Sequence, residues 1–520
     1  MLQNLKALVV VMGIALAVFI LARPLCLRFM TPEDYARRRN VWIALTITAF
    51  ASPSFWLYSI IAMALLAWAA QRDSNPCALY ITMLHVIPPI GLYIPVVGIN
   101  QLFQLNNYRM LSLVVLVPFA IQLLRTPQAR GPRLRMLADA SLIGYAVLQL
   151  VLLMPYESFT NTMRRSFLLT LDVLVVYYVF SRFCVTRRAL TDVMAALCLT
   201  GAIFASVAAF ETVKGWLLYE GLGFVWGRPI DYAYLMRGDS LRAQASLNHS
   251  LPLGYTLAIA FGFALYLSQY LRSRPLALVV GCWMWVGMVA AFGRAPWIVA
   301  VAVYFAYMAL QPSGFVRLVK AGFLATALAT VVVISPIGDR VIDTLPFIGT
   351  ANAESVEYRR RLAEVSWRLI QQNPVLGNPF VLTQMEELRQ GQGIIDLVNS
   401  YASVALLYGL GGLFLFAGTF VSSAWAALRM ARRWTDFDPD TASLGACLVA
   451  CMFGTLLMMA TGSFGNGLAW TAWILAGLCA GYGSLVEEEE AAAYPLDVPQ
   501  MPMDRPGPAI GAGGWAGTRV

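Results

Sequence analysis

Long apolar segments recur from residue 7 to residue 484, and they constrain the fold more than any other feature. A run of about 16–23 mostly apolar residues can cross the hydrocarbon core of a bilayer as an α-helix. We therefore predict an all-α fold, a polytopic transmembrane helical bundle of about 12–15 spans. The predicted segments are 7–22, 41–52, 55–70, 77–98, 109–124, 138–154, 166–181, 191–210, 250–270, 276–292, 295–310, 319–335, 401–424, 442–462 and 467–484.

Two of these segments need comment. Leu8–Leu25 has no small-residue cleavage site after it, so we interpret it as a retained span and not as a signal peptide. The segment 41–52 is short and ends at Ser52-Pro53-Ser54, which predicts a re-entrant or broken piece. If 41–70 were one long span instead, the side of the membrane assigned to the N-terminus would be reversed.

The composition argues against a soluble protein. Of the 520 residues 59% are apolar and 12% are charged, about half of the ~25% charged residues in ordinary soluble domains. Eight cysteines lie in or beside apolar segments, and there are only two histidines, His85 and His249. Because no CxxC or Cys/His ligand spacing exists, we expect no disulfide framework, no metal and no other cofactor.

The net charge of +9 is explained by topology, and we expect no nucleic-acid partner. One set of loops holds most of the basic residues, whereas the opposite short connections hold only Lys6, Arg109, Arg164, Arg165 and Arg294. Positive loops stay in the cytoplasm, so the first set is predicted to be cytoplasmic. That set is Arg23, Arg28, Arg37, Arg38, Arg39, Arg72, Arg125, Arg130, Arg133, Arg135, Arg182, Arg187, Arg188, Arg272, Arg274, Arg317, Lys320, Arg429, Arg432 and Arg433.

Two polar segments, 211–247 and 336–400, are predicted to face outward. A polar insertion as long as 336–400 is uncommon as a mere connection. Within it, apolar residues spaced at i, i+4, i+7 and i+11 predict an amphipathic helix over Glu354–Gln372. The alternative is that this helix only lies on the membrane surface as a lid. The resulting division is 1–335 and 401–484 for the bundle, 336–400 for a periplasmic loop, and 485–520 for a disordered cytoplasmic tail.

Several outward residues are candidates for chemistry. Arg242 and Arg294 lie at helix mouths, and Arg359, Arg360 and Arg361 lie on the predicted loop helix. Guanidinium groups match phosphate oxygens bidentately, although a single arginine at this depth can equally reach lipid headgroups. The candidates for a general base are His249, Glu354, Glu357, Glu364 and Asp396. His85, within an apolar segment, is interpreted as structural.

Four motifs then occur in order over about residues 235–425. Arg294-Ala-Pro-Trp297 resembles the S-R-G-x-W/L element of the superfamily of O-antigen ligases and Wzy-type polysaccharide polymerases. Arg242 with Asn248 and Gly254 resembles the arginine element before the previous span in that family. Tyr358-Arg-Arg-Arg with Pro374-Val-Leu-Gly377 resembles its loop element, and Asn399-Ser-Tyr401 followed by Gly409-Leu-Gly-Gly resembles its H-N-x-Y-L…G-L-I-G element.

The resemblance implies a GT-C-like bundle and a metal-independent glycosyltransferase. Such enzymes take a glycan from a polyprenyl-pyrophosphate carrier at the periplasmic face of the bacterial inner membrane. Carried over here, Arg242 and Arg294 would bind the pyrophosphate, while Asn399 and Tyr401 would belong to the substrate site. One residue departs from the pattern: the histidine of H-N-x-Y is Val398 in this chain. Either His249, Glu354, Glu357 or Asp396 replaces the base, or the acceptor is activated in another way; loss of activity is the remaining alternative.

Three functions are compatible with the sequence. The first is a polymerase that joins polyprenyl-pyrophosphate-linked oligosaccharide repeat units into an exported polysaccharide, with a chain-length regulator, a flippase and membrane lipid as partners. The second is an O-antigen ligase that transfers glycan to lipid A core. The third is a non-enzymatic transporter of lipid-linked oligosaccharide. The middle of the predicted spans is almost free of charge, which favours an enzyme over a transporter.

Overall fold

The computed structural model describes residues 2–95, 101–126, 132–227, 234–237, 240–271, 273–311, single positions between 314 and 330, 353–389, 395–465 and 467–485. The predicted span 319–335 and the predicted tail 485–520 lie almost entirely outside these residues.

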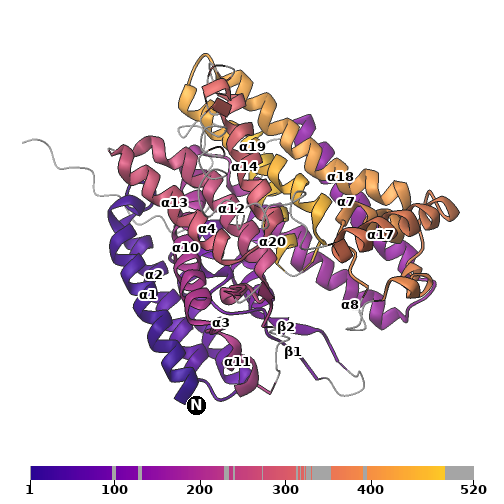
Figure 1. Ribbon diagram of the computed structural model, residues 1–520, viewed down its shortest axis with the longest axis horizontal. Helices are drawn as coiled ribbons and strands as arrows, with labels where there is room; N and C mark the ends of the chain where they lie inside the picture. Colours follow the sequence, from indigo (N-terminus) through magenta and orange to yellow (C-terminus); the bar gives the residue numbers. More distant parts are fainter. Residues whose placement is uncertain are drawn as a thin grey trace, which may run out of the picture.

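Helices make up nearly all of the described chain (Figure 1). The N-terminal half contains α1 (Leu2–Cys26), α2 (Pro32–Ala51), α3 (Phe55–Ala70), α4 (Pro76–Leu84), α5 (Asn107–Leu111), α6 (Val117–Arg125), α7 (Arg133–Leu153), α8 (Phe159–Leu169), α9 (Val175–Phe183), α10 (Arg187–Lys214) and α11 (Glu220–Val225). The C-terminal half contains α12 (Ser250–Leu267), α13 (Arg274–Ala290), α14 (Arg294–Leu310), α17 (Ala353–Gln372), α18 (Ser400–Trp434), α19 (Pro439–Thr461) and α20 (Leu468–Tyr482).

Shorter elements complete the chain. Two π-helical segments, η1 (Ser112–Leu116) and η2 (Thr170–Leu174), join α5 to α6 and α8 to α9 without a break. Two small antiparallel hairpins pair β1 (Gly91–Tyr93) with β2 (Gln104–Asn106), and β3 (Met236–Arg237) with β4 (Ser240–Leu241). Four 3₁₀ turns are η3 (Ala245–Leu247), η4 (Ser268–Tyr270), η5 (Val381–Gln384) and η6 (Glu386–Leu388).

The predicted fold class is confirmed. Among the described residues, 8 helices are long and apolar enough to cross a membrane, and α3, α13, α14 and α20 are shorter apolar helices. By helix length and hydropathy the chain is therefore a multi-pass membrane protein. Large apolar side chains face outward on these helices, for example Ile20, Leu124 and Phe414 at 70%, 70% and 76% exposure, as contact with lipid requires.

The prediction of a span over 77–98 is wrong. All nine residues of α4 are buried, the helix ends at Leu84, and the chain continues through Pro88-Pro89 into the β1–β2 hairpin. Proline cannot continue the helical hydrogen-bond ladder. The segment is apolar because other helices surround it, and hydropathy alone does not distinguish burial in protein from burial in lipid.

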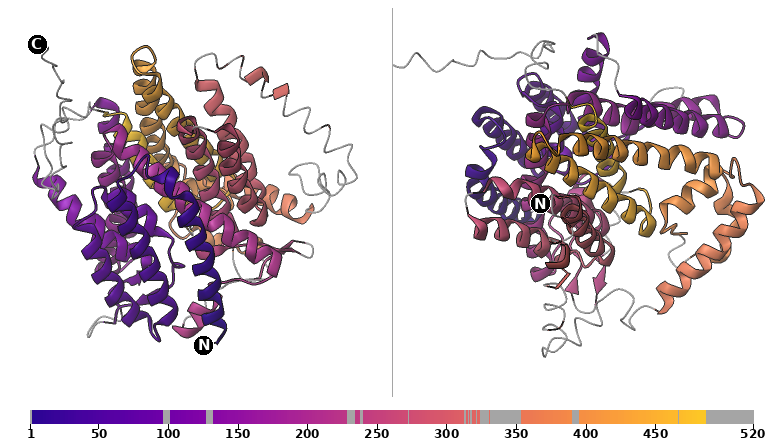
Figure 2. Two further views of the ribbon diagram at one scale, coloured as in Figure 1. Left: turned by 90° about the vertical axis from the view of Figure 1, so that its left-hand side faces the viewer. Right: turned by 90° about the horizontal axis from the view of Figure 1, so that it is seen from above.

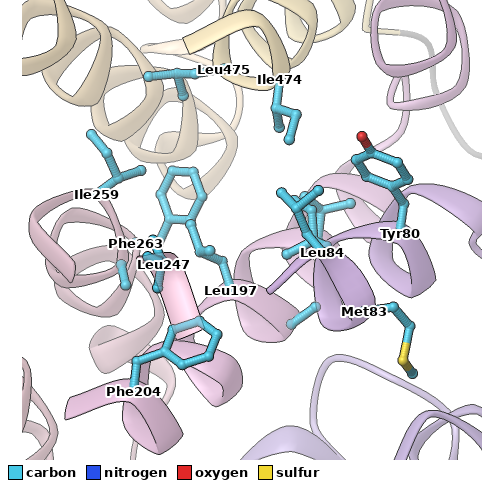
Figure 3. Close-up of a cluster of buried hydrophobic side chains, with 14 of the residues drawn as sticks. Tyr80, Met83, Leu84, Leu197, Phe204, Leu247, Ile259, Phe263, Ile474 and Leu475 are labelled. Atoms are coloured by element: carbon cyan, nitrogen blue, oxygen red, sulfur yellow. The ribbon is translucent and has the colours of Figure 1, made fainter. Parts of the chain in front are cut away.

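A tightly packed core surrounds α4 (Figure 3). Tyr80 and Leu84 of α4 belong to the same buried cluster as Phe204 of α10, Phe263 of α12 and Leu475 of α20. Leu247 of η3, whose residues are all buried, is part of it as well. This core therefore positions the loop before α12, which carries several of the candidate residues.

One end of the bundle, which we call the Arg187 end, gathers the loops predicted to be cytoplasmic. Arg187 at the start of α10 contacts Asp438 before α19 at 3.3 Å, and its Nη2 donates to the Tyr270 hydroxyl after α12 at 2.7 Å. Arg182 at the end of α9 pairs with Asp139 in α7 at 2.6 Å. The structure thus brings together basic loops that are far apart in the sequence.

A buried ion network holds the start of α2 against α10 and the segment before α4. Arg38, 1% exposed, donates to Asp73 before α4 and to Asp192 in α10, each at 2.6 Å. α2 begins at Pro32, ahead of the predicted segment 41–52, where Thr31 is the N-cap and accepts from Asp34 N. The two carboxylates let the charged Arg38 be buried within this extended start. The contact between Arg38 and Asp73 also shows that α2 and α3 are two antiparallel helices, broken at Ser52–Ser54, and not one long span.

The opposite end, which we call the Arg242 end, contains the start of α1. Asn4 Nδ2 donates to Gly221 O of α11 at 3.2 Å, and α11 follows the C-terminus of α10. Figures 1 and 2 show α17 at the periphery of the molecule, away from α1 and α2. The prediction of an amphipathic helix over Glu354–Gln372 is confirmed, because α17 buries Leu362 and Val365 against η5 and η6 while its arginines stay exposed.

Candidate anion-binding site

Three arginines and a histidine converge at the Arg242 end. Arg237 lies in β3, Arg242 follows β4, His249 is the N-cap of α12, and Arg294 is the first residue of α14. Each of these four residues has a close electrostatic neighbour within the set. We call this group the arginine cluster. It contains Arg242, Arg294 and His249, which the sequence analysis proposed, and Arg237, which it did not.

Backbone hydrogen bonds fix the cluster to α10 and α13. Ala243 N donates to Ala290 O at 3.0 Å, so the residue after Arg242 is bonded to the end of α13. Thr212 Oγ1 in α10 lies 3.1 Å from Leu241 O and 3.0 Å from Ala290 O, between the same two segments. The backbone on both sides of Arg242 is therefore held by α10 and α13.

Glu211 holds the turn between Arg242 and His249. Its side chain is fully buried and accepts from three backbone N–H groups, those of Leu218, Gln244 and Ala245, at 3.0, 2.9 and 2.8 Å. A buried carboxylate needs such donors to offset its lost hydration. Glu211 is thus a positioning residue for the loop, because its carboxylate oxygens accept hydrogen bonds from the backbone.

Left-handed backbone conformations concentrate at the cluster. In the part of the chain that the structure describes, three non-glycine residues have positive φ: Ala245 at 46°, Asn248 at 62° and Phe292 at 48°. Ala245 and Asn248 lie between Arg242 and His249, and Phe292 lies two residues before Arg294. Such conformations cost of order 1–3 kcal/mol each and concentrate at functional sites. The strain therefore marks these two loops as a candidate site.

Arg237 and Arg242 make hydrogen bonds to carbonyls. Arg237 Nη1 donates to Phe292 O at 2.7 Å, and Arg242 Nε donates to Ala291 O at 3.4 Å. Among the described residues, neither guanidinium forms an ion pair with a carboxylate. Burial lowers the pKa of both, with Arg294 contributing for Arg237 and Arg237 contributing for Arg242. Both arginines remain charged at neutral pH, and an anion would relieve their mutual repulsion.

Other outward basic residues are bound differently. Arg109, at the start of the span that α5 opens, pairs with Asp172 of η2 at 2.8 Å. Arg164 donates to the carbonyls of Gln101 and Leu102 and to Asn161. The sequence analysis grouped Arg109 and Arg164 with Arg294 as outward charges, and the structure separates them from the cluster.

His249 caps α12 through its ring. Nδ1 accepts from Leu251 N at 3.1 Å. Burial, with Arg242 as a smaller cause, lowers the pKa of the imidazole to about 4, so the ring is neutral at pH 7. A neutral imidazole that accepts at Nδ1 carries its proton on Nε2. Nε2 can therefore donate to an anion, whereas the lone pair that a general base requires is already used. The role of His249 as a base stays a prediction.

The loop residues form a second group around α17. Arg360 pairs with Glu364 at 3.1 Å and Arg361 with Glu357 at 3.0 Å, all of them exposed. Such surface pairs contribute about 0.3–0.5 kcal/mol each, so these two arginines remain available to a ligand. The side chain of Glu354 lies outside the described residues.

Asp396 is exposed and lies at the C-terminal end of the same loop. Its backbone N and O both bond to the Tyr358 hydroxyl at 3.1 Å. Partial burial raises the pKa of the Asp396 carboxyl, and Arg359 nearby opposes this effect. Arg359 of α17 and Asp396 are therefore electrostatic neighbours within the loop, apart from the arginine cluster.

The Asn399 motif has structural contacts. Asn399 Oδ1 accepts from the backbone N of Tyr401 and of Ala402 at 3.0 and 3.1 Å, so Asn399 caps α18. The Tyr401 hydroxyl donates to Leu456 O at 2.8 Å. Val398, where the family has histidine, packs against the apolar side of α17. The role of Asn399 and Tyr401 in substrate binding stays a prediction.

The two groups lie at the same end of the bundle. Ser400 Oγ donates to Gly462 O at 2.7 Å, and a Cβ on Gly462 would lie 3.3 Å from Leu251, two residues after His249. The start of α18 is thus next to the start of α12. An extended substrate that crosses from the cluster to the loop would follow this path.

No family model matches this chain, and comparison with curated proteins finds no significant similarity. The four motifs and the geometry of the arginine cluster are therefore the basis for a functional assignment.

Proposed function

We propose that this chain is a glycosyltransferase of the bacterial inner membrane that polymerises polyprenyl-pyrophosphate-linked oligosaccharide repeat units at the periplasmic face. The observation that carries the proposal is the arginine cluster. Arg237 and Arg242 are fixed at helix mouths, bonded to carbonyls, and have no carboxylate partner among the described residues. A pyrophosphate attached to a membrane-embedded polyprenyl chain carries its charge at this depth.

The cluster suits the departure of a pyrophosphate. When the anomeric carbon–oxygen bond breaks, negative charge grows on the leaving oxygen, and fixed donors that meet this charge lower the barrier. Guanidinium groups supply such donors, and Nε2 of His249 supplies another. The N-termini of α12 and α14 open at the same place, and helix N-termini favour anions. The Arg242 end is therefore suited to hold the donor substrate.

The acceptor sugar would bind toward the loop. We place Asp396 and Glu354 among the candidates for the base that takes the acceptor hydroxyl proton, with Arg359, Arg360 and Arg361 available for further anionic groups. Asn399 and Tyr401 would then hold the start of α18 against the acceptor path. In this assignment a carboxylate acts as the base. The histidine that has this role in the family is replaced by Val398 here.

The test uses the full chain in lipid nanodiscs with polyprenyl-pyrophosphate-linked repeat units. We expect long glycan chains, and we expect Arg242→Gln and Arg237→Gln each to lower the rate by about 100-fold, as for loss of one transition-state donor. Arg72→Gln is the control, because Arg72 stacks on Trp68, 5.1 Å from its ring centre, at the Arg187 end.

The products distinguish the other functions. Transfer only to lipid A core would make the chain an O-antigen ligase. Movement of labelled lipid-linked oligosaccharide across a vesicle bilayer, without a glycan product, would make it a transporter. Unchanged polymer yield in both arginine variants would contradict the proposed role of the cluster.

A further inference from the structure

A groove between α1 and α2 opens at the Arg187 end, remote from the arginine cluster. Its volume is about 450 Å³. It is lined by Phe19, Ile20, Arg23, Pro24, Leu27 and Arg39. The groove therefore combines four apolar side chains with two basic ones and no acidic one.

The walls of the groove differ in exposure. Phe19 is 1% exposed and forms its floor, whereas Ile20 is 70% exposed on the outer side of α1. Arg23 lies in the last turn of α1, and Arg39 lies in the first half of α2. Along α1, the apolar wall of the groove is thus followed by its basic rim. A phospholipid has the same order, with an apolar acyl chain followed by a charged headgroup.

The two arginines are unlike their neighbours in sequence. Arg37 and Arg38 pair with Asp34, Asp73 and Asp192. Arg39 instead donates only to Asn40 Oδ1, from Nε at 3.1 Å and from Nη2 at 2.9 Å. Among the described residues, Arg23 and Arg39 have no carboxylate partner. Two positive charges therefore share one groove without compensation.

The arginines lie close to one another. Both act electrostatically on the hydroxyl of Tyr35, which donates to Phe19 O at the floor of the groove. Since both also line the groove, one phosphate at its mouth would face two guanidinium groups. Arginines near an anionic membrane surface attract such headgroups.

We propose that the α1–α2 groove binds one anionic glycerophospholipid of the leaflet at the Arg187 end. Its phosphate lies between Arg23 and Arg39, and an acyl chain follows Ile20 and Leu27. The positive-inside rule explains why basic residues lie at this end, but it does not require two of them to flank one apolar groove. The proposal is independent of the proposed glycosyltransferase activity.

The test measures lipid binding to the purified full chain by native mass spectrometry in mild detergent, with phosphatidylglycerol and phosphatidylcholine as probes. We expect the wild type to bind one phosphatidylglycerol in preference to phosphatidylcholine. The variant Arg23→Gln/Arg39→Gln should weaken that binding by about 10–30-fold, from two surface charges. The matched control is Arg72→Gln/Arg188→Gln, which removes the same charge from exposed positions at the same end and should bind like the wild type.

A second variant keeps the charges and fills the groove. Ile20→Trp adds bulk on the lipid-exposed side of α1, and we expect it to weaken phosphatidylglycerol binding while thermal stability is retained. The proposal is overturned if the double groove variant keeps the preference, if the control loses as much binding, or if Ile20→Trp has no effect. Tighter binding of polyprenyl phosphate than of phosphatidylglycerol in this groove would also overturn it.

Discussion

Glu211 directs both of its oxygens to backbone donors, and this makes the residue sensitive to a small change. One oxygen accepts from Leu218 N, and the other accepts from Gln244 N and Ala245 N. We expect Glu211→Gln to lower the free energy of unfolding by about 2–3 kcal/mol, because an amide NH₂ would face an N–H group and the charge that strengthens the bonds is lost. Thermal unfolding in detergent measures this.

Glu220→Gln is the control for that substitution. Glu220 lies near the same end and, within the described residues, accepts from the exposed Tyr234 hydroxyl at 2.7 Å. The substitution Glu220→Gln should change the free energy of unfolding by less than about 1 kcal/mol. Equal losses in the two variants would mean that Glu211 does not hold the turn.

His249 predicts a pH dependence with a definite sign. Burial lowers the pKa of its imidazole to about 4 in the folded protein, whereas the unfolded value is near 6.5. As the pH falls below about 6.5 the unfolded chain binds a proton first, so stability that is complete above pH 6.5 is lost toward pH 4. His249→Asn keeps a capping acceptor and removes the titration.

The wild type should therefore lose about 2 kcal/mol more than His249→Asn between pH 7 and pH 4.5. Thermal melts of both proteins across this range measure the difference. Parallel curves would show that another group sets the acid sensitivity, and would argue against a buried, neutral His249.

At the scale of elements, the loop after α17 docks into a break in α18. Gly409 has φ 67° and ψ −174° inside that helix. The backbone groups that the break frees are bonded to the turn after α17: Leu410 N donates to Pro374 O at 2.7 Å, and Asn378 N donates to Leu406 O at 2.8 Å. The two glycine-containing motifs that the sequence analysis treated separately are thus halves of one contact.

Gly409→Ala should open this contact. A Cβ at Gly409 would lie 2.2 Å from Val375 O, and the φ of 67° is unfavourable for alanine. We expect a loss of about 1–3 kcal/mol and faster tryptic cleavage at Arg359–Arg361, since α17 would be held less firmly. Gly13→Ala is the control, because a Cβ there meets nothing within 4 Å. Unchanged cleavage of the Gly409 variant would show that the contact does not anchor α17.

At the scale of the whole molecule, the end of α20 lies at the Arg187 end of the bundle. The Tyr482 hydroxyl in the last turn of α20 donates to Thr441 O at the Arg187 end, at 2.7 Å. Because its basic loops predict that the Arg187 end is cytoplasmic, a fluorescent protein fused after Leu485 should fold in the cytoplasm. Alkaline phosphatase inserted within 336–350, the segment predicted from the sequence to be periplasmic, should be active in the periplasm. The reverse pattern of fluorescence and phosphatase activity would invert the assignment of the two ends.

The spans were largely predictable because apolar length is a local property. The failure over 77–98 and the early start of α2 have a different cause: both depend on partners far along the chain, such as Asp192 for Arg38. Arg242, Arg294 and His249 were identified because each comes just before a span. Arg237 carried no such signal, since only the β3–β4 hairpin brings it toward Phe292.

We expect the conservation pattern around Glu211 to differ from that around the arginines. Its partners are peptide N–H groups, and every residue except proline supplies one. Positions 218, 244 and 245 can therefore vary freely with respect to this interaction, while position 211 demands a carboxylate of one length. In a set of divergent homologues we expect a single invariant glutamate with no motif around it, which a search for contiguous patterns would not detect.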